Sequence, residues 1–246
     1  MHSTVVPDLI EAILMEQYPS AVLGYLDRFT NKRDFLGWHY HHDATNFYHS
    51  PSLSSVCTYD TASLDLQTPA VPGAITWARK EHVIPENATG ILFGGFIAWH
   101  SEDRNNPQHI ALMLDTQKGD KRRYFAVRWV NFQDVKRMRW QVSTSGGETL
   151  RWSNVESGIQ DLPFNEADKY MFFPVIVEVD LVAGAYKRIL ANGRDLDPSS
   201  IEVGTGEFLP HFTDGVVSIF EIHNRRDQRK EGNMNVSRPF IAFLLG

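Results

Sequence analysis

Hydrophobic and polar residues alternate over short stretches through most of the chain, with the period of half-buried β-strands. After Ser63 these stretches recur at strand length and are separated by Gly, Asn, Asp and Pro, which favour turns. The predicted strands are 73–79, 90–99, 109–115, 124–132, 138–143, 150–155, 172–181, 186–191, 216–223 and 236–245. Helical patterns are nearly absent after Phe29, so we predict an all-β fold, a two-sheet antiparallel β-sandwich.

The N-terminal segment has a different pattern. Leu9, Ile10, Ile13 and Leu14 have helical spacing, and Pro19 is placed to end a short helix. Residues 22–29 continue the apolar pattern, and residues 31–60 indicate loops and short strands. We therefore predict a single domain over 1–246, with an N-terminal helical extension over 1–30 and the β-sandwich over 63–246.

Composition and charge narrow the class of protein. Hydrophobic residues make up 42% of the chain and charged residues 22%, which excludes global disorder. The net charge of −6 excludes a generic basic nucleic-acid binder. A single cysteine, Cys57, excludes a disulfide scaffold. No signal-peptide pattern and no run of about 20 apolar residues is present, so we expect a cytoplasmic protein with no membrane partner.

Three segments resemble the concanavalin A-like lectin/glucanase jelly roll. They are FPVIVEVDL at 173–181 with its return to Asn192-Gly193, GILFGGFIAW at 90–99, and PFIAFLL at 239–245. The resemblance implies a jelly-roll sandwich whose concave sheet binds a glycan. It matches no specific enzyme family, because no third acid follows Glu178 and Asp180 as in many jelly-roll glucanases.

Strand alternation groups the candidate site residues by face. Glu178 shares a face with Asp180, and Glu221 with His223, each opposite apolar neighbours. If these faces belong to one sheet, they form a cleft with two carboxylates, a histidine and arginines, which suits a glycoside hydrolase or a polysaccharide lyase. The candidate catalytic residues are Glu178, Glu221 and His223, and the candidate ligand-binding residues are Trp38, Trp99, His100, Arg128, Arg139, Gln141, Trp152 and Asp180. The alternative is an ordinary solvated face, with Asp180 capping a turn and the tryptophans in the core.

The histidine-rich run at 38–43 is a weak metal candidate. His39, His41 and Asp43 point together in an extended strand, and a third ligand would have to come from His49, His100 or His109. The alternative is surface or hydrogen-bonded histidines, and we expect no cofactor.

Three functions follow from these observations. The first is binding of an oligosaccharide or an accessory role in sugar metabolism, and the second is a glycoside hydrolase or lyase. The third is an oligomeric interaction module, a homo-oligomer with no small ligand, whose exposed aromatic residues are buried between subunits.

Overall fold

A computed structural model describes most of the β-region and part of the N-terminal segment. The described residues are 9–29, 36–42, 52–54, 63–101, 107–132, 137–145, 150–155, 172–191, 194–198, 201–227, 229 and 231–246. Cys57, Asp43, His49 and Asn192-Gly193 lie outside these ranges.

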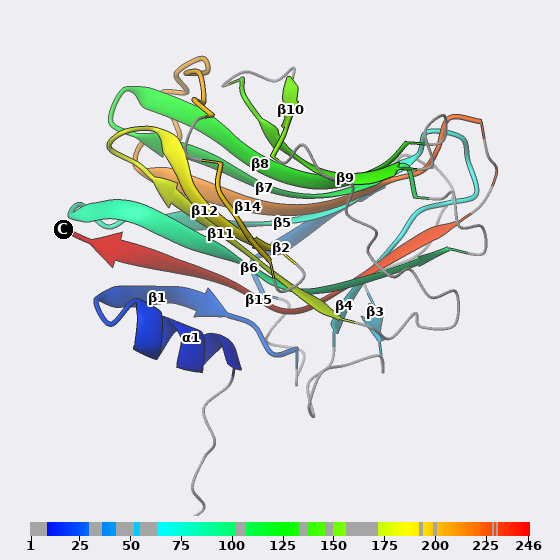
Figure 1. The fold of residues 1–246 in the computed structure, drawn as a ribbon, viewed down its shortest axis with the longest axis horizontal. Coiled ribbons are helices and arrows are strands. Elements are labelled where there is room, and N and C mark those ends of the chain that lie inside the picture. Colours follow the sequence, from blue (N-terminus) through cyan, green and yellow to red (C-terminus); the bar gives the residue numbers. More distant parts are fainter. Residues whose placement is uncertain are drawn as a thin grey trace, which may run out of the picture.

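Two antiparallel β-sheets pack face to face, as Figure 1 shows. The seven-stranded sheet has the order β10 (Trp152–Asn154), β9 (Arg137–Ser143), β8 (Lys121–Phe132), β7 (His109–Lys118), β14 (Gly215–His223), β5 (Ile75–Val83) and β2 (Trp38–His42). The eight-stranded sheet has the order β13 (Arg194–Leu196), β12 (Ala185–Ala191), β11 (Phe173–Asp180), β6 (Ala88–Ser101), β15 (Gly232–Leu245), β4 (Ser63–Gln67) and β3 (Ser52–Ser54), and β1 (Ala21–Leu26) also pairs with β15. The predicted all-β sandwich is confirmed.

The core lies between the two sheets and is built from alternate residues of each strand. Leu112, Val127 and Phe220 point inward from the seven-stranded sheet, and Val177 and Ile241 point inward from the other, each with no more than 1% of its surface exposed. The residues between them along each strand therefore face outward.

A short helix covers the outer face of the eight-stranded sheet. Helix α1 (Leu9–Gln17) buries Ile10 against a second apolar cluster that includes Ile176 and Phe240. Figure 1 shows α1 on the side of this sheet away from the seven-stranded sheet, next to β1. Part of the outward surface of the eight-stranded sheet is thus used for packing.

The predicted N-terminal helix is confirmed, but the prediction of a helical extension through residue 30 is wrong. Ala21–Leu26 forms β1, because its backbone pairs with the segment of β15 from Phe240 to Leu244. Residues 31–60, for which we predicted loops and short strands, contain the short strands β2 and β3. The hairpin predicted between 172–181 and 186–191 is formed by β11 and β12.

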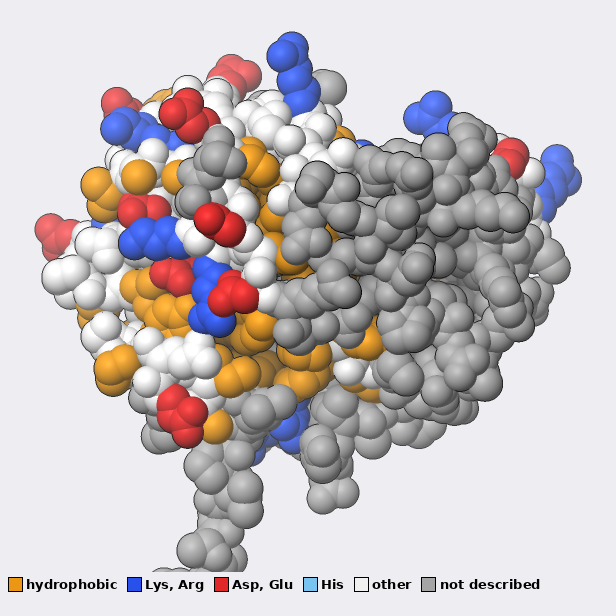
Figure 2. Space-filling view, in the orientation of Figure 1, with side chains coloured by type: hydrophobic (Ala, Val, Ile, Leu, Met, Phe, Trp, Pro, Cys, Tyr) orange, Lys and Arg blue, Asp and Glu red, His pale blue; other side chains and the backbone are white. Residues whose placement is uncertain are grey.

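The described surface mixes charges of both signs. Figure 2 shows Lys and Arg side chains interspersed with Asp and Glu side chains over the described part of the visible face. Among the helices of the described ranges, none is long and apolar enough to cross a membrane.

Candidate functional site

The register of the seven-stranded sheet aligns outward-facing residues in one row across all its strands. Glu221 on β14 lies opposite Ala111 on β7 and opposite Trp77 on β5. Pairing continues from Ala111 to Arg128, from Arg128 to Gln141 and from Gln141 to Asn154 in one direction, and from Trp77 to His41 in the other. We call this set the polar row: His41, Trp77, Glu221, Ala111, Arg128, Gln141 and Asn154.

Arg128 is fixed within the polar row by its neighbours on β9 and β10. Its Nε and Nη2 donate to Gln141 Oε1 at 2.9 and 2.7 Å, and Gln141 Nε2 donates to Asn154 Oδ1 at 3.0 Å. The guanidinium carbon lies 4.0 Å from the ring centroid of Trp152, a cation–π distance. The arginine is thus pre-oriented before any ligand binds.

A histidine–glutamate–histidine cluster shares Glu221 with the polar row. His109 and His223 are direct cross-strand partners on β7 and β14, and their rings stack with centroids 4.0 Å apart. His223 Nε2 lies 2.8 Å from Glu221 Oε1, and His109 Nε2 lies 3.7 Å from the same oxygen. The side chains of His109, Glu221 and His223 are 12%, 17% and 21% exposed.

These surroundings set the charges of the cluster. Burial lowers the pKa of His109 to about 4, and the positive charge of Arg128 acts in the same direction. Burial alone would raise the pKa of Glu221, but the adjacent His109 and His223 imidazoles outweigh it and lower that pKa to about 2. At neutral pH, Glu221 is therefore an anion beside a neutral His109. Burial also lowers the pKa of Arg128, to about 10, which leaves it charged.

Aromatic side chains lie toward both ends of the polar row. Near β10, Trp152 packs with Leu150 against a small apolar patch of Ala111, Met113 and Ala126. At the other end, Trp77 stacks on His41 with ring centroids 5.2 Å apart. The row therefore combines hydrogen-bonding groups with flat apolar surfaces.

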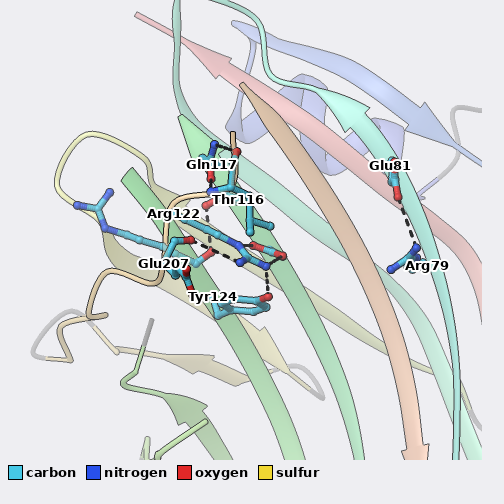
Figure 3. Close-up of polar contacts among 10 residues, drawn as sticks. Arg79, Glu81, Thr116, Gln117, Arg122, Tyr124 and Glu207 are labelled. Atoms are coloured by element: carbon cyan, nitrogen blue, oxygen red, sulfur yellow. Dashed lines mark hydrogen bonds and ion pairs between the residues drawn. The ribbon is translucent and has the colours of Figure 1, made fainter. Parts of the chain in front are cut away.

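Another polar group on the same sheet face serves packing. Arg122 forms a bidentate pair with Asp115, at 2.9 and 2.7 Å, and contacts the Tyr124 hydroxyl. Gln117 exchanges two hydrogen bonds of 2.8 Å with the backbone of Leu209 (Figure 3). These bonds fasten the segment around residues 206–209 to the sheet, so Arg122 is engaged internally.

The structure brings together five of the residues predicted from the sequence. Arg128, Gln141, Trp152, Glu221 and His223 all lie on the outer face of the seven-stranded sheet. The backbone of Arg139 lies on β9 opposite Val130, and its side chain is outside the described residues.

Glu178 and Asp180 are in the other sheet, so the single cleft that included them is wrong. Alternation along β11 was predicted correctly, but β11 pairs with β6 and β12, which belong to the eight-stranded sheet. Glu178 accepts a 2.7 Å hydrogen bond from the Tyr18 hydroxyl. Asp180 caps the hairpin turn by accepting from the backbone amides of Val182 and Ala183, both at 2.8 Å, which is the structural alternative considered for it.

Trp38 and Trp99 are core residues, so neither is an exposed ligand-binding platform, and the alternative of core packing holds for both. Trp99 is 4% exposed and packs on Trp129 across the sandwich at 4.9 Å. Trp38 is 6% exposed, and its Nε1 donates to Asp27 at 2.8 Å. His100 pairs with Asn233 in the eight-stranded sheet, and its side chain is not described.

The histidine-rich run forms edge strand β2, where His39 and His41 are exposed. The group with donor atoms close enough to share a metal ion is instead His109, Glu221 and His223, within 4.8 Å of one another, among the residues that the structure describes. The sequence analysis named His109 only as one of three possible third ligands for His39 and His41. Trp77 and Asn154 were not predicted as site residues. Their only signal in the sequence was the alternation along their predicted strands, which places both side chains on an outward face.

No protein-family model and no curated protein matches the chain. Solved structures share its fold. The Emp47p carbohydrate recognition domain is 7% identical with a TM-score of 0.53, over 93% of this chain and 96% of that one. The Emp46p carbohydrate recognition domain in a potassium-bound form is 8% identical with a TM-score of 0.51, over 89% and 96%. Lectin UEA-II complexed with galactose is 10% identical with a TM-score of 0.52, over 92% and 98%. These matches confirm the fold-level resemblance to concanavalin A-like lectins.

Proposed function

We propose that the chain binds an oligosaccharide along the polar row on the outer face of the seven-stranded sheet. The observation that carries this proposal is the row itself, a pre-oriented set of donors and acceptors that reaches from strand to strand with tryptophans toward both ends. Sugars are recognised by such a combination, because aromatic rings contact their C–H faces while polar groups bind their hydroxyls.

The proposal is supported by the chemistry of individual groups. Asn154 is exposed and joined to Gln141, so it offers hydrogen bonds at the edge of the row. Glu221 is an acceptor at neutral pH, and Arg128 is a donor whose orientation is already fixed. Pre-orientation reduces the entropy lost on binding.

The fold of the solved neighbours points in the same direction. Two of them are carbohydrate recognition domains and a third is a lectin complexed with galactose. Fold alone does not establish function. The neighbours therefore support the class of ligand, and the polar row supports its location.

Hydrolysis by two carboxylates finds no support in the described residues. Glycosidases place their two carboxyl groups about 5–9.5 Å apart. Asp115 and Glu81 share the outer face with Glu221, but each is four residues along its strand from the partner of Glu221, which corresponds to about 13 Å. Glu178 is in the other sheet.

A polysaccharide lyase is the second candidate function. The ionised Glu221 lies 2.8 Å from His223 and two strands from Arg128, which is an arrangement suited to abstracting a proton beside a sugar carboxylate. A lyase leaves a carbon–carbon double bond in its product, so incubation with polyuronic acids and measurement of ultraviolet absorbance tests this candidate. Product formation lost in H223A would support it.

Isothermal titration calorimetry against a panel of neutral and acidic oligosaccharides tests the binding proposal. R128M should weaken binding about tenfold or more, because a charge-assisted hydrogen bond to a ligand contributes about 1.5–3 kcal/mol. R188M is the matched control, since Arg188 is an arginine on the opposite sheet, bonded to Asp195. Equal affinity in R128M and wild type would contradict the location, and binding of no glycan by a stable oligomer would favour the interaction module.

A further inference from the structure

We propose that His109, Glu221 and His223 form a binding site for one Zn²⁺ ion on the outer face of the seven-stranded sheet. The three side chains come from two adjacent strands, and all project from the same face because of the antiparallel register. His109 lies directly opposite His223, and Glu221 is two residues before His223 on β14. The site is therefore determined by sheet pairing and contains no loop residue.

The spacing of the donor atoms fits a metal ion. In a tetrahedral site with ligands about 2.0–2.1 Å from zinc, neighbouring donors are about 3.3–3.5 Å apart. Here the separations from Glu221 Oε1, 2.8 Å to His223 Nε2 and 3.7 Å to His109 Nε2, lie on either side of that value. The three donor atoms lie within 4.8 Å of one another, and metal binding requires the stacked imidazoles to rotate so that both nitrogens turn toward a common point.

The donor set selects the kind of cation. Two imidazole nitrogens and one carboxylate oxygen match three-ligand zinc sites, which keep a fourth position for water or another ligand. Calcium and magnesium prefer oxygen ligands, so a site with two nitrogens disfavours them. His109 Nε2 at 3.7 Å is also beyond hydrogen-bond length from Glu221, so binding a metal would replace a long contact with a bond.

Local charge is compatible with a divalent cation. Arg128 is the basic member of the polar row, but its Nε and Nη2 are turned to Gln141, and its guanidinium lies over Trp152. Both of these partners are on β9 and β10, the side of β8 away from β14. The three side chains of the cluster are 12–21% exposed, so an ion can reach them from solvent.

Calorimetric titration of ZnCl₂ into untagged, chelator-treated full-length protein tests the site. We expect one Zn²⁺ per chain, binding weakened about 100-fold or more in H109A and H223A, and unchanged binding in H211A, which alters an exposed histidine. The melting temperature of the wild type should rise by about 5 °C or more at 100 times the Kd. Substitution of Co²⁺ should give the visible absorption of a tetrahedral site.

Several results would overturn the proposal. One is that the wild type binds no Zn²⁺. Another is that the H109A/H223A double variant binds Zn²⁺ as tightly as the wild type. A third is that H211A loses as much Zn²⁺ affinity as H109A and H223A do. If H223A does not fold by circular dichroism, H223N replaces it, because Asn retains part of the shape and polarity of His. These titrations contain no sugar, so their outcome is independent of the glycan-binding proposal.

Discussion

Replacement of Gln141 by Leu tests whether the polar row is pre-oriented or is a chance alignment of surface groups. Gln141 is 8% exposed, and its Oε1 accepts both hydrogen bonds from Arg128, at 2.9 and 2.7 Å. In Q141L the half-buried guanidinium keeps its charge but loses this acceptor. The Leu side chain has a similar volume, so the perturbation is mainly the lost pairing.

The magnitude follows from the number and kind of bonds lost. One hydrogen bond to a charged group contributes about 1.5–3 kcal/mol, the two bonds from Arg128 share one acceptor oxygen, and the apolar Leu side chain offsets part of the loss. We expect Q141L to lower the free energy of unfolding by about 2 kcal/mol. For a chain of 246 residues this corresponds to a fall in melting temperature of about 4–8 °C.

A double-mutant cycle measured by urea unfolding isolates the pair. R128M alone leaves Gln141 Oε1 without its donor, and Q141L alone leaves the charge without its acceptor, whereas the R128M/Q141L variant removes both partners. The double variant should therefore be more stable than the sum of the single effects predicts, by about 1–2 kcal/mol. Additive effects within about 0.5 kcal/mol would refute the view that Gln141 holds Arg128 in place.

Two further predictions concern the sandwich that carries the site. Gly94 on β6 has φ 156°, and a Cβ atom there would lie 1.9 Å from the carbonyl oxygen of Val175, so G94A should lower the free energy of unfolding by about 3 kcal/mol or more. Gly119 lies in an open turn at φ 59°, so G119A should lower it by only about 1–2 kcal/mol. Equal losses of stability in urea unfolding would contradict this account. His82 stacks on Tyr25 at 4.6 Å, and burial, reinforced by Lys80, lowers the pKa of His82 to about 4. Because an unfolded His titrates near 6.5, the unfolded state takes up more protons between pH 6.5 and pH 4, and stability falls as the pH falls through this window. H82Q should reduce that loss between pH 7 and pH 5, and an unchanged pH dependence in H82Q would count against the assignment.

The strands and their inward and outward faces were predictable because a period of two is a local property of the sequence. Val177 and Val179 on one side and Glu178 on the other were assigned correctly from alternation alone. Pairing between strands is a long-range property. β14 lies between β5 and β7, which are more than 90 residues earlier in the chain, and no local pattern near Glu221 indicates this.

The errors at individual site residues have the same physical origin. Glu178 was placed with Glu221 because both alternate with apolar residues, although the sheet to which each belongs depends on distant partners. Trp38 has polar neighbours in sequence, yet β2 adds to the sheet edge with that ring facing the core. His109 begins its strand, and only the register with β14 brings it to His223.

The central claim, that an oligosaccharide binds on the outer face of the seven-stranded sheet, can be tested with methionine methyl groups as reporters. Met113 lies on that face in the apolar patch with Ala111 and Ala126, whereas Met234 is fully buried in the core. In protein labelled with ¹³C-methyl methionine, titration with a binding oligosaccharide should shift the Met113 resonance and leave Met234 in place. Saturable binding that leaves Met113 unshifted would contradict the claim.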